Sequence, residues 1–90
     1  MEVEFYARIT VMDREKVDGA LKTLFEKVIR PGYEVKRLHA TPIEGGWYKV
    51  EVMGRTNLEK AISLFTSLAR AGWNVAIGTN LSEGDYWEDD

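Results

Sequence analysis

Several residue types that carry chemistry are scarce in this 90-residue sequence, which contains no cysteine and a single histidine, His39. The lack of cysteine excludes disulfides, thiolate metal ligands and a cysteine nucleophile. With one histidine there is no second imidazole to share a metal ion, and no serine and aspartate stand at a spacing typical of a nucleophilic triad. We therefore expect a protein that is not an enzyme and that holds no metal and no cofactor.

Long apolar stretches are missing as well. No segment approaches the ~20 consecutive apolar residues that a membrane-spanning helix requires. The first residues are partly acidic and continue directly into an alternating pattern, unlike a secretory or transit peptide. The hydrophobic content of 44% is ordinary for a globular domain. These features predict a cytoplasmic protein with no membrane contact.

The formal net charge of −3 conceals an uneven distribution. Five of the fifteen acidic residues lie within residues 83–90, whereas no lysine or arginine follows Arg70. Residues 1–82 contain all twelve basic residues and ten acidic ones, so the body of the chain is mildly basic. We interpret residues 1–81 as a single domain and residues 82–90 as an acidic, aromatic C-terminal tail.

Two kinds of periodicity define the first half of the domain. Apolar residues at every second position of residues 3–11 predict a strand. The helical spacing of apolar residues over 17–29 predicts a helix, for which Asp13 is the expected N-cap. A second strand over 33–41 changes phase near residues 36–37, which predicts a β-bulge at that point.

The second half repeats this order of elements. After a glycine-containing turn, residues 47–53 alternate as a third strand, and Thr56 with Glu59 predicts a capping box at the start of a second helix. Gly72 is expected to end that helix. Residues 73–77 then alternate as a fourth strand. The sequence therefore predicts two successive strand, helix and strand units.

The resulting βαββαβ order is typical of a ferredoxin-like sandwich in the α+β class. Identical or similar residues recur 40 positions apart in the two halves, including Gly32 with Gly72 and Tyr33 with Trp73. We expect a four-stranded antiparallel sheet in the order 4-1-3-2. Both helices should cover one face of the sheet and leave the other face open.

The open sheet face is the first candidate site. If the apolar phase of each strand faces the helices, Glu4 and Glu51 point outward together with aromatic, basic and methionine side chains. The candidate partner-binding residues of this face are Tyr6, Arg8, Arg37, His39, Trp47, Lys49 and Met53. Trp, Tyr, Met and Arg are enriched in the cores of protein interfaces. The face predicts a non-catalytic module that binds another protein, with a homodimer through the sheet or an edge strand as the expected assembly.

Two other functions are weighed for the same fold. The chain resembles the RRM family of RNA-binding domains in topology alone, and those domains stack bases on aromatic residues of the central strands. Residues 46–52 lack the spaced aromatic pair of that family, and a mildly basic body gains little from counterion release, so binding of single-stranded nucleic acid is disfavoured. A small-ligand regulatory domain similar to the ACT family is the other alternative, although residues 11–16 lack a glycine that would let the backbone close on a ligand.

The tail is the second candidate site. Its candidate partner-binding residues are Asp85, Tyr86, Trp87 and Glu88. An aromatic pair can anchor in an apolar pocket while the acids steer the segment toward a basic partner. Short chains with no cysteine, no active site and one aromatic surface are similar as a class to virus-encoded inhibitors of host machinery. A small inhibitor or adaptor is one version of the predicted function.

Overall fold

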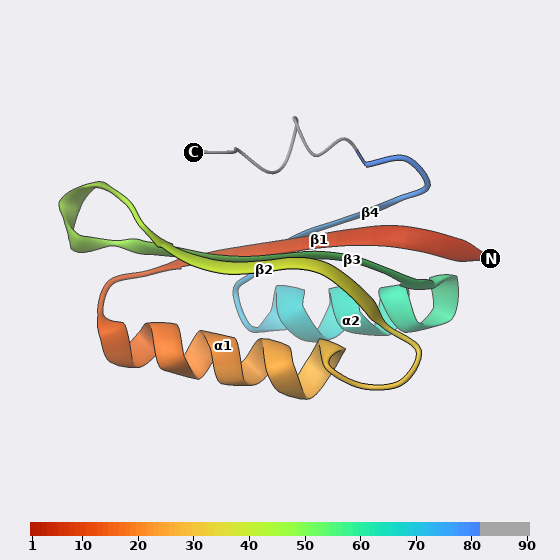
Figure 1. Cartoon of the computed structure of the whole chain (residues 1–90), viewed down its shortest axis with the longest axis horizontal. Helices are drawn as coiled ribbons and strands as arrows, with labels where there is room; N and C mark the ends of the chain where they lie inside the picture. Colours follow the sequence, from red (N-terminus) through yellow and green to blue (C-terminus); the bar gives the residue numbers. More distant parts are fainter. Residues whose placement is uncertain (82–90) are drawn as a thin grey trace.

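The computed structural model describes residues 1–81, which form four strands, two helices and one short 3-10 helix (Figure 1). In chain order these are β1 (Glu2–Val11), α1 (Arg14–Val28), β2 (Glu34–Pro42), η1 (Glu44–Gly46), β3 (Tyr48–Asn57), α2 (Leu58–Arg70) and β4 (Asn74–Gly78). The predicted succession of four strands and two helices is confirmed. The candidate tail residues Asp85, Tyr86, Trp87 and Glu88 lie outside the described residues.

The four strands form one antiparallel sheet in the spatial order β2-β3-β1-β4, so the two longest strands, β1 and β3, lie at its centre. Counted from β4, this order is 4-1-3-2. Both helices pack beneath the same face of the sheet, and the described part of the chain places no helix over the opposite face (Figure 1). The chain is therefore an α+β protein, as predicted.

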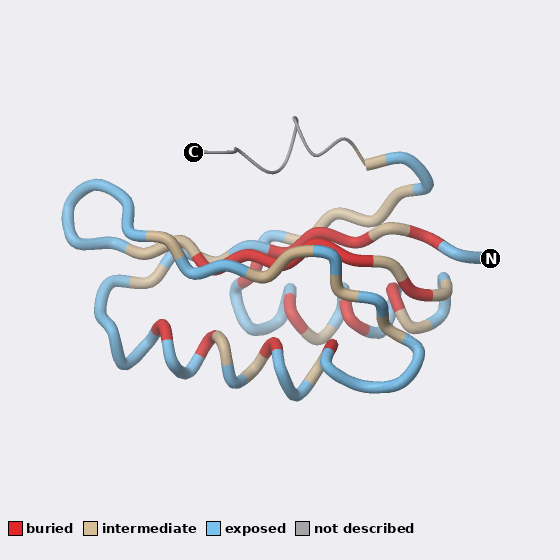
Figure 2. The backbone as a smooth tube through the Cα atoms, in the orientation of Figure 1, coloured by how far each residue is buried: buried red, intermediate tan, exposed pale blue. Residues whose placement is uncertain are grey.

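The hydrophobic core fills the space between the sheet and the helices, where the buried parts of the backbone face one another (Figure 2). Phe5 and Val52 of the central strands have no exposed surface, and neither do Leu24 of α1 and Leu68 of α2. The Phe5 ring meets Tyr33 edge to face, with 6.2 Å between the ring centroids. Each fully buried side chain of this kind contributes about 1.5–3 kcal/mol.

The structure shows which residues are the N-caps of the two helices, and only one of them agrees with the N-cap predicted from the sequence. Asp13 is the N-cap of α1 as expected, because its carboxylate accepts a hydrogen bond of 3.0 Å from the backbone N–H of Lys16. The predicted capping box at Thr56 is wrong. β3 continues through Asn57, whose side chain caps α2 by accepting from the N–H of Lys60 at 2.8 Å. Within residues 1–81 neither helix combines the length and the apolar character needed to cross a bilayer.

Two features of the chain path follow directly from the sequence. Gly32 and Gly72 adopt φ angles of 94° and 91° just after the two helices, a left-handed conformation that favours glycine. The forty-residue repeat thus places a glycine of positive φ in the connection after each helix, although Gly32 follows the last residue of α1 by four positions and Gly72 follows that of α2 by two. The predicted bulge is also confirmed, because the register of β2 against β3 shifts between Val35 and Arg37. This shift keeps the apolar residues on both sides of the bulge directed toward the helices.

Candidate functional site

The strand register gathers six of the seven candidate sheet-face residues on the open face. Tyr6 of β1 is directly opposite Met53 of β3, and Arg37 of β2 is opposite Met53 on its other side. Arg8 and His39 flank Glu51 of β3 in the same way. The same alternation carries Lys49 to this face, two residues before Glu51. Residues separated by up to 47 positions in the sequence therefore share one surface.

Trp47, the seventh candidate residue, lies elsewhere. The prediction places it on the third strand, but β3 begins at Tyr48 and Trp47 belongs to the hairpin between β2 and β3. Its backbone carbonyl accepts a hydrogen bond of 2.8 Å from the N–H of Ile43, and 40% of the residue is exposed. The positive φ angles of Gly45 and Gly46 delay the start of the strand. Trp47 is thus a residue of the hairpin tip.

The aromatic and methionine part of the predicted contact surface is buried. Tyr6 is 5% exposed and Met53 is 1% exposed, so the expectation that they are presented to a partner is wrong for the described structure. They form a small second hydrophobic cluster, against which Ala76 of β4 and Leu81 pack. The chain after β4 therefore contributes to the cover of the open face, and the periodicity of the strands alone does not show this.

A buried polar network stands at the centre of the open face. Glu51 is 2% exposed, and its Oε2 accepts a hydrogen bond of 2.5 Å from the Tyr6 hydroxyl. Its other oxygen, Oε1, lies 3.3 Å from Nζ of Lys49, whose side chain is 19% exposed. A buried carboxylate is costly unless it is paired and hydrogen-bonded, and both conditions are met here. The network therefore belongs to the stability of this face.

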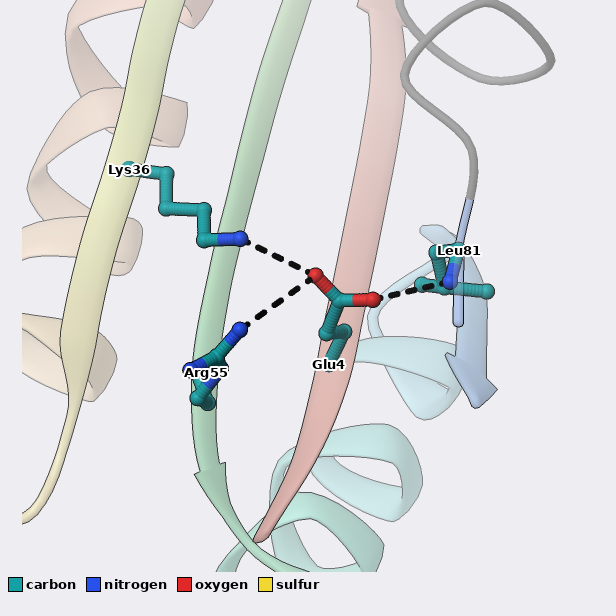
Figure 3. A network of polar contacts seen from close by, with 4 residues as sticks. All are labelled: Glu4, Lys36, Arg55 and Leu81. Atoms are coloured by element: carbon teal, nitrogen blue, oxygen red, sulfur yellow. Dashed lines mark hydrogen bonds and ion pairs between the residues drawn. The ribbon is translucent and has the colours of Figure 1, made fainter. Parts of the chain in front are cut away.

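A second polar network is built around Glu4 at the other end of the open face (Figure 3). Its Oε2 lies 3.0 Å from Nζ of Lys36 and 4.0 Å from Arg55, and its Oε1 accepts a hydrogen bond of 2.8 Å from the N–H of Leu81. The Lys36 hydrogen bond, followed by that of the Leu81 amide, lowers the pKa of the Glu4 carboxyl. Glu4 thus holds β2 and the residues after β4 to β1.

The accessible side chains of the open face are polar and predominantly basic. Arg8 and His39 are exposed, whereas Arg37 and Lys49 are half-buried. We call these four residues the polar rim. Both acids that the sequence predicts on this face are engaged within the chain, because Glu4 pairs with Lys36 and Glu51 with Lys49. Arg8 is exposed and positively charged, so a partner that approaches this face meets at least this charge.

The described residues also show what kinds of chemistry the site contains. Among residues 1–81 no three histidine, aspartate or glutamate side chains gather as a cluster that could hold a metal ion. The shallow hollows found over α2 are lined by residues such as Ile62, Ser63 and Arg70, on the layer away from the open face. The open face thus combines a buried centre, formed by Tyr6, Met53 and Glu51, with charged side chains around it.

Comparisons with known proteins give a likeness in fold. No protein-family model matches the chain, and no curated protein matches it either. Among solved structures, the chain is similar to a de novo designed protein, Foldit4, with a TM-score of 0.67 and 25% sequence identity. The match covers 91% of this chain and 99% of the designed one. The likeness supports the arrangement of a four-stranded sheet with two helices and carries no activity.

Sequence reasoning missed the interactions that close the open face. The alternation shows that the Glu51 side chain points away from the helices. It does not show that the Glu51 carboxylate is buried and contacts Tyr6 and Lys49. One available signal is the placement of Lys49 and Glu51 two residues apart on one strand, because side chains at that spacing share a face. Leu81 carries no such signal, since it follows the last strand and its contacts depend on the path of the chain.

Proposed function

We propose that this chain is a non-catalytic protein-interaction module of the ferredoxin-like type, acting in the cytoplasm as a small inhibitor or adaptor. Its open sheet face recognises an acidic surface of another protein through the polar rim. The observation that carries this proposal is the separation of roles on that face. Tyr6 and Glu51 are buried in interactions within the chain, whereas Arg8 and His39 remain exposed above them.

A rigid face with a charged periphery suits recognition of a complementary surface. The buried cluster and the Glu51 network fix the backbone of β1 and β3, so the rim residues start from an ordered position. Opposite charges across an interface accelerate association and select the correct partner more than they add affinity. We therefore expect an association that depends on salt and on the sign of the charge at Arg8.

Binding of single-stranded nucleic acid is the second candidate function, and the basic rim is the observation that favours it. Stacking of bases on aromatic rings contributes about 1–3 kcal/mol per base in such complexes. Tyr6, the aromatic residue of β1 that points to the open face, is 5% exposed and hydrogen-bonded to Glu51, so its ring offers no free platform. Trp47 is exposed, but it lies in the hairpin away from the centre of the sheet. We therefore rank this function below protein binding.

The test is a comparison of two charge reversals of equal size on opposite layers. Arg8→Glu alters the polar rim, and Lys22→Glu alters the exposed surface of α1 as the matched control. Immobilised full-length chain is used to capture partners from a native extract, with and without nuclease, at low and high salt. We expect the partner captured by wild type to be retained by Lys22→Glu and to fall at least about 10-fold with Arg8→Glu.

Thermal melting of both variants shows whether they remain folded. Equal capture by the two folded variants contradicts a role of the polar rim. Capture that disappears after nuclease treatment, together with direct binding of a fluorescent single-stranded oligonucleotide by wild type, replaces the proposal with the nucleic-acid function.

A further inference from the structure

Helix α2 carries two apolar stripes, of which the core uses one. Ala61, Leu64 and Leu68 are buried against the sheet. A second set, the outer stripe, consists of Leu58, Ile62, Phe65 and Ala69. These positions follow one another at intervals of four, three and four residues, which places them on one side of a helix. The exposed fractions of Leu58, Ile62 and Phe65 are 38%, 53% and 43%.

The outer stripe continues onto the N-terminus of the chain. The backbone N–H of Leu58 donates a hydrogen bond of 2.9 Å to the carbonyl of Met1, which is itself 81% exposed. Met1, Leu58 and Ile62 line a shallow hollow at this end of α2. A run of large apolar side chains that share one surface is typical of an interaction site, whereas single exposed apolar residues are not.

We propose that the outer stripe is a self-association surface, on which two copies of this chain pack their α2 helices antiparallel about a two-fold axis. The spacing of the stripe is self-complementary in that arrangement. Leu58 of one copy falls opposite Ala69 of the other, and Ile62 falls opposite Phe65. Leu58 thus meets the small side chain of Ala69 at each end, and the two-fold axis repeats every pair, so the same patch serves on both copies.

The charges beside the stripe also fit a second copy of the chain in this orientation. Glu59 lies in the first turn of α2 and Arg70 in its last turn, on the same flank of the outer stripe. Two antiparallel copies bring each Glu59 toward Arg70 of the second copy. Parallel copies leave these two residues about 16 Å apart along the helix axis. Antiparallel helix dipoles add to the preference.

This surface lies on the helix layer, so it is independent of the polar rim proposed as the partner site. The contact of one helix pair is small compared with the interfaces of stable complexes, so we expect a weak dimer in the micromolar range or above. The dimer leaves both open sheet faces accessible. A failure of self-association therefore has no bearing on the function proposed for the rim, and the reverse also holds.

The first experiment measures self-association of the full-length chain by sedimentation equilibrium over a wide concentration range. Ile62→Lys places a charge in the centre of the stripe, and Phe25→Lys makes the same change at a residue of α1 that is also 53% exposed. We expect Ile62→Lys to weaken the dimer at least 10-fold and Phe25→Lys to leave it unchanged. A wild-type chain that stays monomeric at all concentrations, or equal effects of both variants, overturns the proposal.

The second experiment tests the orientation by charge exchange. Glu59→Arg alone places two arginines together in each of the two pairs and should weaken the dimer by about 3- to 10-fold, as expected for exposed ion pairs. The double variant Glu59→Arg with Arg70→Glu should restore the wild-type constant. A double variant as weak as the single one contradicts the antiparallel pairing.

The third experiment uses the absence of cysteine in the natural sequence. The double variant Leu58→Cys with Ala69→Cys should form a disulfide-linked dimer under mild oxidation, visible on a non-reducing gel. The two positions are about 16 Å apart along one helix, which is too far for a bridge within a single copy. Ala69→Cys alone should remain unlinked. Linked dimer with Ala69→Cys alone indicates parallel helices and overturns the proposed arrangement.

Discussion

The two faces of the sheet are formed by alternate residues of the same strands, and they reach low exposure in different ways. Phe5 and Tyr6 are neighbours in β1, and their exposed fractions are 0% and 5%. Phe5 lies among apolar side chains of both helices and the sheet. Tyr6 lies against Met53 and Leu81 and donates its hydroxyl hydrogen bond to Glu51. One face is closed by apolar packing against the helices, and the other by a small apolar cluster together with polar pairing.

This difference shows what each face contributes to the protein. Apolar burial is roughly proportional to area and is insensitive to direction, so the helix-covered face supplies most of the folding free energy. A buried hydrogen-bonded pair adds little net stability to the native fold. Any other arrangement of the strands that buries one partner without the other loses the free energy of its desolvation. The open face therefore contributes chiefly to the specificity of strand register and orientation.

The sharpest contrast between the faces is expected for Phe5→Ala. Removal of the ring leaves a cavity in the core and abolishes the edge-to-face contact with Tyr33, at a cost of about 3–5 kcal/mol. Chemical denaturation should show this loss as a lower midpoint with an unchanged slope. A loss below about 1 kcal/mol would mean that the space at Phe5 collapses and that the covered face is less well packed than described.

The next effect concerns the buried network of the open face. Tyr6→Phe removes the hydroxyl donor of Glu51 and should cost about 1–3 kcal/mol, because the carboxylate stays buried with one partner fewer. Glu51→Gln should cost a similar amount, and the double variant should cost less than the sum of the two. Additive losses in this double-mutant cycle, measured by denaturation, would show that the two groups do not act together.

A smaller effect is expected from Glu4, and it depends on pH. The folded pKa of Glu4 is lowered by Lys36 and by the amide of Leu81, so its contribution to stability is fully present above the ordinary glutamate pKa of 4.5. It disappears as the pH falls through the lowered folded value. At pH 7 Glu4→Gln should be less stable by about 1 kcal/mol or less, as for an accessible ion pair.

The stability curves of wild type and Glu4→Gln should therefore converge as the pH falls below the lowered pKa of the folded carboxyl. Thermal melting of wild type and Glu4→Gln from pH 7 to pH 3 measures this convergence. A difference that persists at the acidic end would show that the variant acts through packing and that the charge of Glu4 is not the cause.

The smallest effect should come from Arg8 of the polar rim. Arg8→Gln changes an exposed residue outside both buried networks and should alter stability by less than about 0.5 kcal/mol. Its denaturation curve should overlay that of the wild-type chain. A loss comparable to that of Tyr6→Phe would place Arg8 in the structural network and remove the distinction between rim and centre on which the proposed function depends.

Much of the fold was predictable because patterns among neighbouring residues specify its strands, helices and turns. The alternation in β1 and β3 correctly separates inward from outward residues, and Asp13 and the bulge near Arg37 have clear local signatures. The N-cap of α2 was assigned one residue early, because Thr56 and Asn57 are both good caps and the strand extends to the second. The position of Trp47 was missed because two glycines before it lengthen the hairpin.

The sequence by itself determined the elements, their order and the face to which each strand residue points, because these depend on periodicity and on neighbouring residues. Only the tertiary structure decided that Tyr6 and Met53 are buried on the open face, that Glu51 is paired, and that the outer stripe of α2 is left exposed. These outcomes depend on which strands lie side by side and on where the chain passes after β4. Burial is a property of contacts between distant segments, and no local pattern specifies it.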